Sequence, residues 1–258
     1  MKNLEKFNNL IQIMSNLRGP NGCNWDKEQD HKSIKNNLIE EAYELLEAID
    51  EKNPDKMKEE LGDLLLQIIF HSQMAKEEKQ FDIYDVIDVL SQKLVRRHPH
   101  VFGESNAKTS KEIINQWENI KKEENDKQHR KSITDGIPKH LPSILKAVKI
   151  QKKVSKVGFD WKHVDDVINK IQEELDEVKQ AHNEKQALAA IKEEIGDLLF
   201  ASINLARFLD ICPDDALSGT ITKFQKRFKY IEVNLNKPLE TASSEELEAL
   251  WEQAKKKS

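Results

Sequence analysis

EELGDLLL at residues 59–66 returns as EEIGDLLF at residues 193–200. Each copy places a glycine between acidic residues, in a segment whose apolar positions recur at helical spacing. Glycine inside a helix costs about 1 kcal/mol relative to alanine, and like charges three or four positions apart add a few tenths. A chain that accepts both costs twice is expected to use those acids for binding or for chemistry.

The repetition extends beyond this stretch. EEAYE (40–44) aligns with EELDE (173–177) at a shift of 133 residues, and the glycine-containing segments align at a shift of 134. KLVRR (93–97) aligns with KFQKR (223–227) at a shift of 130. Three segments in the same order with nearly constant shifts indicate a tandem duplication of one helical unit.

Composition favours a soluble helical protein, because 34% of the residues are charged and only 6% are aromatic. The net charge of -5 offers no basic excess for a nucleic-acid polymer. No apolar run approaches the roughly 20 residues that span a bilayer, and the amino-terminal segment lacks the apolar core of a signal peptide. Cys23 and Cys212 lie far apart and are expected to be free thiols. We therefore expect a cytoplasmic protein without a membrane partner.

The periodicity predicts an all-α fold of two tandem helical bundles. Asn53-Pro54 supplies a turn that lets the helices on either side pack antiparallel. Further helices are predicted from Ile83 to Arg97 and from Lys111 to Glu124. A charged segment containing proline and glycine then separates the halves. The predicted organisation is an amino-terminal domain at 1–124, a linker at 125–142 and a carboxy-terminal domain at 143–258.

Four acids in each copy are expected to converge. Residues three apart on a helix share a face, with Cβ atoms about 5–6 Å apart, and the tight turn brings two such faces together. The first set is Glu41, Glu44, Glu60 and Asp63, and the second is Glu174, Glu177, Glu194 and Asp197. Because each acidic pair begins with two adjacent glutamates, Glu40, Glu59, Glu173 and Glu193 are alternatives for the register.

A divalent metal is the favoured explanation of these acids, with a solvated acidic surface as the alternative. Converging carboxylates repel one another and raise their pKa values, and the GDLL segments offer no lysine to neutralise them. Oxygen ligands without histidine or cysteine favour Mg²⁺, with Mn²⁺ as the second choice. Gly62 and Gly196 would let a ligand or a facing helix approach closely, or would serve simple packing.

Basic pairs recur with the acids. Lys93 and Arg97 are four apart, as are Lys223 and Arg227, so each pair shares a helix face. Such pairs can neutralise phosphate oxygens, and Mg²⁺ in proteins often shares its coordination with phosphates. The sequence contains no GxxxxGK[ST] loop. Together these features favour phosphate chemistry outside the P-loop class.

The motifs resemble those of a known family. An ExxE pair, a gap of about fifteen residues and an ExxD pair are similar to the signature of the all-α nucleoside triphosphate pyrophosphohydrolases. LRGPNGCNWDKEQDHKSI and EEAYELLEAI resemble the MazG proteins in particular. DGIPKHLPSILKAVKIQKKVSKVGFDW resembles the segment that leads into the second MazG domain.

This resemblance implies helical bundles that form a homodimer and hydrolyse nucleoside triphosphates to the monophosphate and pyrophosphate. It implies that the two acidic sets bind metal and that Lys223 and Arg227 contact phosphate. Trp251 and Lys255 match further substrate-contacting positions of the family. Lys121 matches one more such position, and the neighbouring Lys122 matches it nearly as well.

Several alternatives remain open at this stage. Glu173 or Glu193 is expected to orient or deprotonate the attacking water. Trp25, Trp161 and Trp251 either stack on a base or anchor a helix. Because Trp251 and Lys255 have no clear equivalent after the first copy, the carboxy-terminal copy is expected to be the active one. A non-catalytic scaffold that binds metal or nucleotide, and a hydrolase specific for dUTP or phosphoribosyl-ATP, are the competing functions to broad specificity.

Overall fold

The computed structural model describes residues 2–123 and 132–257, with side chains for 4–121 and 132–257. The described residues form helices and no strand, which confirms the all-α prediction. The chain divides into two compact units, Met1–Gln128 and His129–Ser258. Residues 125–131 of the predicted linker and the side chain of Lys122 lie outside the described part.

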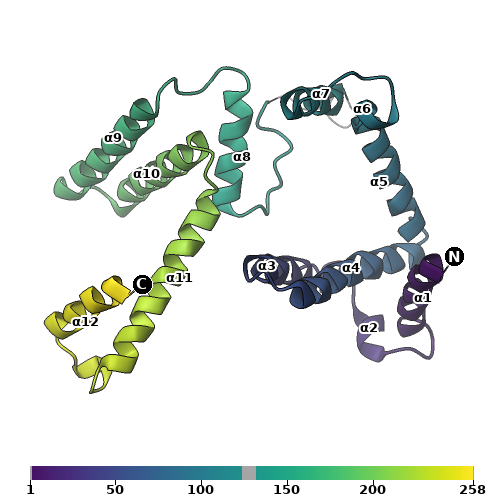
Figure 1. Cartoon of the computed structure of the whole chain (residues 1–258), viewed down its shortest axis with the longest axis horizontal. Coiled ribbons are helices and arrows are strands. Elements are labelled where there is room, and N and C mark those ends of the chain that lie inside the picture. Colours follow the sequence, from purple (N-terminus) through teal and green to yellow (C-terminus); the bar gives the residue numbers. More distant parts are fainter. Residues whose placement is uncertain (1, 124–131, 258) are drawn as a thin grey trace. The chain divides into compact units, whose positions relative to one another are not determined.

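The first unit contains seven helices in its described residues (Figure 1). They are α1 (Lys2–Leu17), α2 (Asn24–Glu28), α3 (Asn37–Asp50), α4 (Pro54–Glu77), α5 (Ile83–Arg97), α6 (Pro99–Phe102) and α7 (Ser110–Glu123). Helices α3 and α4 pack as a hairpin, and α1 and α5 pack against α4. Helix α5 has the predicted bounds because Asp82 and Asp85 form a capping box at its start and Pro99 follows its end.

The second unit repeats the hairpin. Its helices are α8 (Ser143–Ser155), α9 (Val164–Asn183), α10 (Leu188–Phe208), α11 (Pro213–Asn234) and α12 (Ser244–Lys257), with a 3₁₀ turn, η2, at Leu239–Thr241. Helices α9 and α10 form the hairpin, α8 packs against α10, and α12 packs along α11. Figure 1 shows α11 leaving the hairpin region and carrying α12 on its distal half.

Both hairpins turn through the same backbone motif. After α3, Lys52 adopts a φ of 52°, and after α9, Lys185 adopts a φ of 53°. The N–H of the residue that follows each lysine donates to the carbonyl of a buried alanine in the last helical turn, Ala48 or Ala181, at 3.2 and 3.0 Å. This is the Schellman arrangement, which satisfies the last carbonyl groups of a helix. In the first hairpin, the Asn53 side chain also caps α4, as the predicted Asn53-Pro54 turn requires.

The two units are packed differently. The first has a contiguous core made of large side chains, namely Met14, Ile34, Ile69, Phe70, Met74 and Ile83. In the second, the buried apolar residues are mostly small, namely Ala147, Val167, Ala181, Ala201, Ile231 and Ala254. Because burial stabilises in proportion to apolar area, the described part of the second unit gains less from its own core.

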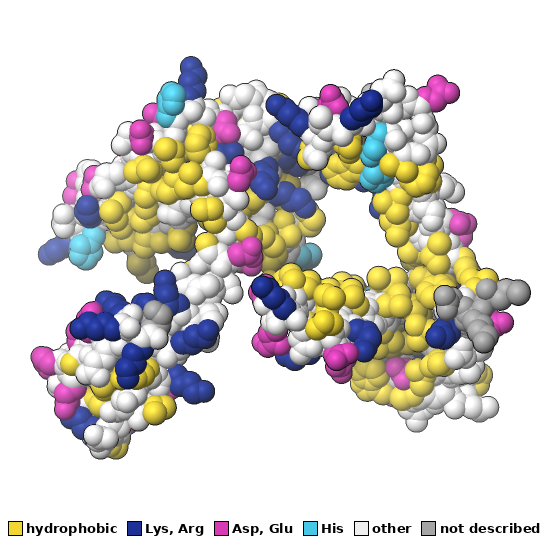
Figure 2. All heavy atoms as spheres, in the orientation of Figure 1, with side chains coloured by type: hydrophobic (Ala, Val, Ile, Leu, Met, Phe, Trp, Pro, Cys, Tyr) yellow, Lys and Arg dark blue, Asp and Glu magenta, His cyan; other side chains and the backbone are white. Residues whose placement is uncertain are grey.

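Many large apolar side chains are exposed on both hairpins. Figure 2 shows such side chains gathered over α9 and α10, where Leu175, Ile195 and Leu199 are 36%, 44% and 59% exposed. The total exposed area is 19381 Å². A compact monomer of 29.9 kDa exposes about 12,000 Å², and two separate halves would expose about 14,000 Å². None of the described helices is both long enough and apolar enough to cross a membrane.

An arginine–carboxylate pair ties the loop before each hairpin to the end of its second helix. In the first unit, Arg18 makes a bidentate pair with Glu77, with its Nη2 2.7 Å from Oε2. In the second, Arg207 Nη1 donates to Asp160 Oδ2 at 2.9 Å. Both arginine side chains are 8% exposed. The paired arginines hold the pKa values of Glu77 and Asp160 below their usual range.

Candidate metal and nucleotide site

The hairpin turns bring three acids of the first copy together. Ligand oxygens of Glu41 and Glu44 on α3 and of Glu60 on α4 all lie within 4.8 Å of one another. Glu41 and Glu60 are half-buried and Glu44 is exposed. The predicted convergence of carboxylates across the α3–α4 turn is therefore present in the structure.

The electrostatics of this first cluster are unfavourable without a cation. Burial, followed by the charges of Asp63 and Glu44, raises the pKa of Glu41. Burial also raises the pKa of Glu60, and the charges of Glu44, Glu59 and Asp63 add to it. Asp63 thus lies close enough to act on the cluster. A hard divalent cation would relieve this repulsion, because carboxylate oxygens are its preferred ligands.

The second copy also brings three acids together, but one of them occupies a different position in the repeat. Oxygens of Glu174 on α9 and of Glu194 and Asp197 on α10 lie within 4.8 Å of one another. Glu174 is only 5% exposed. Glu177 adjoins the group, since a hydrogen bond with Glu174, and then burial, raise its pKa. All four predicted ligands of this copy therefore lie in one neighbourhood.

A lysine enters the second cluster. Lys170 Nζ lies 2.7 Å from Glu174 Oε1 and 2.8 Å from Glu173 Oε1. These two carboxylates raise the pKa of the lysine above its usual value. The expectation that these acids lack a neutralising lysine was wrong for Glu174, because Lys170 on α9 lies one turn before it. At the 133-residue shift, the equivalent position in the first copy is Asn37.

The remaining acids and the two glycines line the periphery. Glu173 is 57% exposed and Glu193 is exposed, so both face solvent beside the cluster. A Cβ atom added at Gly62 or Gly196 would meet no described atom of the chain within 4 Å. Packing against another described helix of the same chain therefore does not explain either glycine. The close approach of a ligand or of a second molecule is the explanation that is left.

Three of the predicted basic residues, Arg97, Lys121 and Arg227, contact tryptophan rings. The guanidinium carbon of Arg97 lies 5.3 Å from the ring centroid of Trp117, and that of Arg227 lies 5.8 Å from that of Trp251. Lys121 Nζ lies 4.5 Å from the Trp117 centroid. These distances are within the range of cation–π contacts.

The expectation that Trp251 and Lys255 have no equivalent in the first copy was wrong. At a shift of 134 residues, Trp117 and Lys121 correspond to Trp251 and Lys255. The structure gives Trp117 and Trp251 the same arginine contact. Lys255 pairs with Glu252, three residues before it on the same helix. The repeat in the sequence therefore continues beyond residues 97 and 227.

The four basic positions lie on helices that extend from the hairpins. Lys93 and Arg97 are in the last turns of α5, and Lys223 and Arg227 are in the second half of α11. Figure 1 shows α5 and α11 running away from the α3–α4 and α9–α10 hairpins, respectively. Helix α11 meets α10 near its start, where Ala216 and Leu217 line a groove with Ile203 and Ala206. Each unit therefore presents an acidic hairpin and a separate basic arm.

Comparison with known proteins agrees with this arrangement. The model of a family described as "MazG nucleotide pyrophosphohydrolase domain" matches residues 29–102 and 163–231, one match in each unit. These two segments contain both acidic clusters and both Lys/Arg pairs.

Relatives match over nearly the whole chain. The nucleoside triphosphate pyrophosphohydrolase/pyrophosphatase MazG of Thermotoga maritima is 48% identical over 252 residues, which cover 96% of this chain and 95% of that protein. A nucleoside triphosphate pyrophosphohydrolase of Escherichia coli strain K12 is 43% identical over 98% of each chain. The duplicated acidic hairpins, the two domain matches and these relatives show that the chain belongs to the MazG nucleotide pyrophosphohydrolase family.

Proposed function

We propose that this protein hydrolyses nucleoside and deoxynucleoside triphosphates, with broad base specificity, to the monophosphate and pyrophosphate. The observation that carries the proposal is the convergence of three carboxylates within 4.8 Å in each hairpin, on residues that the family match covers. The relatives named above are nucleoside triphosphate pyrophosphohydrolases by name, which supports the same reaction here.

The donor set fits Mg²⁺, with Mn²⁺ as the alternative ion. The ligands would be Glu41, Glu44, Glu60 and Asp63 in one unit, and Glu174, Glu177, Glu194 and Asp197 in the other. All are carboxylates, and burial, followed by repulsion among them, raises the pKa values of Glu41 and Glu60. When bound, the ion would polarise phosphate oxygens and lower the pKa of a water molecule.

The protein's own groups would direct this water to the α-phosphorus. Glu173 and Glu193 face solvent beside the cluster, and either can accept a proton from the water as it attacks. The water oxygen forms the new bond to the α-phosphorus, the bond to the bridging oxygen breaks, and pyrophosphate leaves as one unit. In the second copy, Lys170, which pairs with Glu174, could instead pair with a phosphate oxygen if a metal ion were bound by that carboxylate.

The basic arms would bind the rest of the triphosphate. Lys223 and Arg227, and likewise Lys93 and Arg97, share helix faces that can hold phosphate oxygens. Trp251 and Trp117 lie against the arginines, with Lys255 and Lys121 one turn further along α12 and α7. These aromatic and cationic groups form a surface that suits a nucleotide.

A homodimer would bring an acidic hairpin to a basic arm. The exposed area exceeds that of two separate compact halves by about 5,000 Å² per chain, which is more than the roughly 2,500 Å² per partner that a large obligate dimer interface buries. The apolar side chains exposed over α9 and α10 supply such an interface (Figure 2). The open space beside Gly62 and Gly196 fits the approach of a second molecule or of the nucleotide.

A product assay tests the proposal. Purified protein is incubated with Mg²⁺ and a panel of ribo- and deoxyribonucleoside triphosphates, and monophosphate, pyrophosphate and orthophosphate are resolved. Monophosphate with pyrophosphate, lost on adding EDTA, is the expected result. Orthophosphate with diphosphate would place the attack at the γ-phosphorus, and cleavage of dUTP or phosphoribosyl-ATP alone would contradict broad specificity. Binding without turnover would leave the scaffold function.

A further inference from the structure

Two histidines of the first unit, His31 and His71, meet outside the acidic cluster. His31 lies in the segment between α2 and α3, and His71 lies in the second half of α4. Their Nδ1 atoms are 2.7 Å apart, the ring planes differ by 2° and the ring centroids are 5.0 Å apart. The difference between these two separations is about the width of one imidazole ring. The rings of this histidine pair therefore meet edge to edge, with the two nitrogens facing each other.

Only some protonation states allow this contact. A hydrogen bond between two Nδ1 atoms needs a proton on one nitrogen and a lone pair on the other. Two neutral rings of different tautomers meet this condition, and so does a neutral ring beside an imidazolium. Two imidazolium rings do not, because both nitrogens then carry a proton and both rings carry a positive charge. The contact therefore survives the first added proton and is broken by the second.

The surroundings of His71 do not favour a positive charge. Burial, followed by the charge of His31, lowers the pKa of His71, and no charged group of α1, α3 or α5 contributes among the described residues. The residues one turn away on α4 are uncharged, namely Gln67, Ile68, Met74 and Ala75. No carboxylate on the helices packed around His71 therefore compensates for a proton on its ring.

The charged groups near His31 are exposed or already paired. Asp30, on which the charge of His31 acts, accepts hydrogen bonds from two backbone N–H groups of its own turn. Lys32 and Lys35 in the same segment are exposed. Arg18, directly after α1, pairs with the last residue of α4. Of these groups only Asp30 favours a positive charge on the pair, which suits one protonated ring rather than two.

The histidine pair connects the segment before α3, residues 29–36, to α4. Other contacts fix the two ends of this segment. Arg18 Nη1 donates to the carbonyl of Gln29 at 3.2 Å, and Ile34 is 2% exposed within the core. Helix α3, which carries two acids of the first cluster, begins at Asn37. A change in the pair is therefore transmitted to the start of α3.

The second unit has apolar residues at the corresponding positions. At the shift of 133 residues His31 corresponds to Val164, and at the shift of 134 residues His71 corresponds to Leu205. All four side chains are half-buried. Valine and leucine can pack here at any pH, whereas two imidazole rings need a matched proton. Packing alone therefore does not account for the histidines of the first unit.

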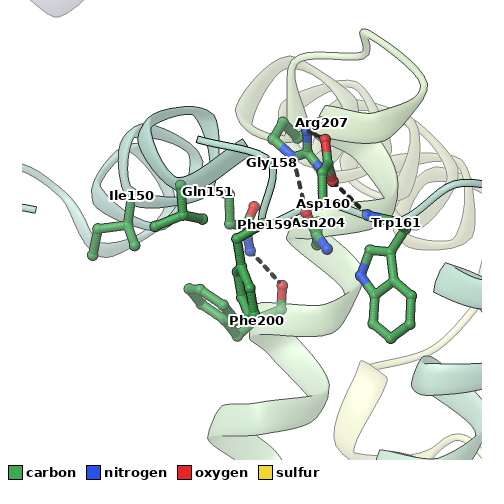
Figure 3. A pocket seen from close by; sticks show the side chains of 10 residues that line it. Ile150, Gln151, Gly158, Phe159, Asp160, Trp161, Phe200, Asn204 and Arg207 are labelled. Atoms are coloured by element: carbon green, nitrogen blue, oxygen red, sulfur yellow. Dashed lines mark hydrogen bonds and ion pairs between the residues drawn. The ribbon is translucent and has the colours of Figure 1, made fainter. Parts of the chain in front are cut away.

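A ligand pocket does not account for the histidine pair either. In the second unit, Asn204 beside Leu205 lines a pocket of about 370 Å³ between α8, α10 and the loop before α9. Its aromatic walls, visible in Figure 3, are Phe159, Trp161 and Phe200. In the first unit, Phe70 takes the position of Asn204 and is 4% exposed in the core. Nor does a third potential metal ligand join the histidines among the described residues.

We propose that the histidine pair is an acid-sensitive latch. It holds the segment 29–36 against α4 while at most one of its rings is protonated, and it releases the segment when both are protonated. Release loosens the start of α3 and, through it, the acids of the first cluster. The second unit, with Val164 and Leu205 at these positions, has no such latch. Mild acid therefore acts on one copy of the duplicated unit and spares the other.

The pH range of this latch follows from the direction of the pKa shift. His71 has a lowered pKa in the folded chain, so the unfolded chain binds more protons below the ordinary value of about 6.5. The contribution of the pair to stability is complete above this pH. It decreases as the pH falls below 6.5 and stops decreasing once the pH is below the lower folded value.

Hydrogen–deuterium exchange of the full chain tests the latch at pH values of about 7.5 and about 5.5, after correction for the intrinsic pH dependence of exchange. The variant with both His31→Val and His71→Leu carries the residues of the second unit. It keeps the acids of the first cluster, so it separates the histidines from carboxyl titration. His140→Gln, which changes an exposed histidine of the second unit, is the control. NMR titration of the histidine Cε1–H signals in the wild type provides a measurement that needs no variant.

In the wild type and in His140→Gln, amides of residues 32–37 should exchange about fivefold faster at the lower pH, the change expected when one hydrogen bond is lost. In the double variant the change should be less than about twofold, and residues 161–167 should not respond in any of the three proteins. The His71 signal should titrate below pH 6.5. Equal acceleration in the wild type and the double variant would overturn the latch. Independent titration of both histidines at their ordinary pKa would overturn it even if the double variant did not fold.

Discussion

The two acidic clusters differ in their neighbouring lysines: Lys56 acts on Glu60 in the first copy, whereas Lys170 pairs with Glu174 in the second. Around Glu41, Glu44 and Glu60, repulsion and burial raise carboxyl pKa values, and Asn37 stands at the position that corresponds to Lys170. Around Glu174, the lysine pairs with the buried carboxylate at 2.7 Å. A second difference lies about two turns beyond Asp63 and Asp197, where Phe70 fills a core and Asn204 lines a pocket. Duplication preserved the acidic residues, while the surroundings of the two clusters diverged.

The largest expected effect concerns which copy turns over substrate. Glu194→Gln should lower kcat/KM for nucleoside triphosphates by at least about 100-fold, because it removes a ligand from the cluster beside Lys170 and the pocket. Glu60→Gln should lower kcat/KM by less than about fivefold. Steady-state kinetics on both variants, with circular dichroism as the folding control, decides the matter. Comparable losses in the two variants would show that the divergence does not separate their activities.

Metal affinity in the absence of nucleotide sharpens the same comparison. In Glu60→Gln only the second cluster is intact, and a metal must displace Lys170 from Glu174. In Glu194→Gln only the first cluster is intact, and among the described residues its nearby lysine, Lys56, pairs with Glu51 outside the cluster. Electron paramagnetic resonance of free Mn²⁺ should therefore give about tenfold weaker binding for Glu60→Gln, after allowing for the partial exposure of Lys170.

Adding Lys170→Gln to Glu60→Gln is the matched control for the metal measurement. The double variant should approach the affinity of Glu194→Gln to within about threefold, because the competing cation is gone. An unchanged affinity would mean that Lys170 does not compete with the metal, and the charge difference between the clusters would then have no consequence for loading.

Whether a contact of the fold or of the candidate site could be predicted from the sequence depends on how far apart its two residues are along the chain. The helix pairs and the acidic clusters were predicted, because they depend on local features. These features are the spacing of residues within each helix and the short loop of three or four residues between the two helices. The Lys170–Glu174 pair was not predicted, although the two residues are only four apart. The Arg207–Asp160 pair joins residues 47 apart and Arg18–Glu77 joins residues 59 apart, and no local pattern links either pair. The pocket depends on α8 packing against α10, which spacing alone does not specify.

Those two arginine pairs predict different acid sensitivities for the units. Arg207 lowers the pKa of Asp160, so the pair stabilises the fold above the unfolded pKa of about 3.8, and the contribution is lost as pH falls through the lower folded value. Asp160→Asn should cost about 1–2 kcal/mol at pH 6 and flatten the loss of stability between pH 4 and pH 2. Urea unfolding across this range measures both quantities.

Glu77→Gln serves as the comparison. Arg18 lowers the pKa of Glu77 as well, but the Glu77 side chain is 37% exposed whereas Asp160 is 28% exposed. Solvent screening should hold its effect below about 1 kcal/mol at pH 6, with the pH-dependent part beginning below about 4.5. A larger loss for Glu77→Gln than for Asp160→Asn would contradict this order.

The smallest effect is expected where the two copies agree. Lys52 and Lys185 end α3 and α9 with positive φ values of 52° and 53°, a conformation that costs an L-residue about 1 kcal/mol and a glycine nearly nothing. Lys52→Gly and Lys185→Gly should each raise the free energy of unfolding by about 0.5 kcal/mol, after the extra freedom of glycine in the unfolded chain is subtracted. Lys149→Gly, inside α8, should instead lower it by about 1 kcal/mol. Equal gains in stability from Lys52→Gly and Lys185→Gly would show that the duplication kept the backbone geometry of both hairpin turns, although the charges and the pocket around the hairpins diverged. A gain at only one turn would show that the backbone of the hairpins also diverged.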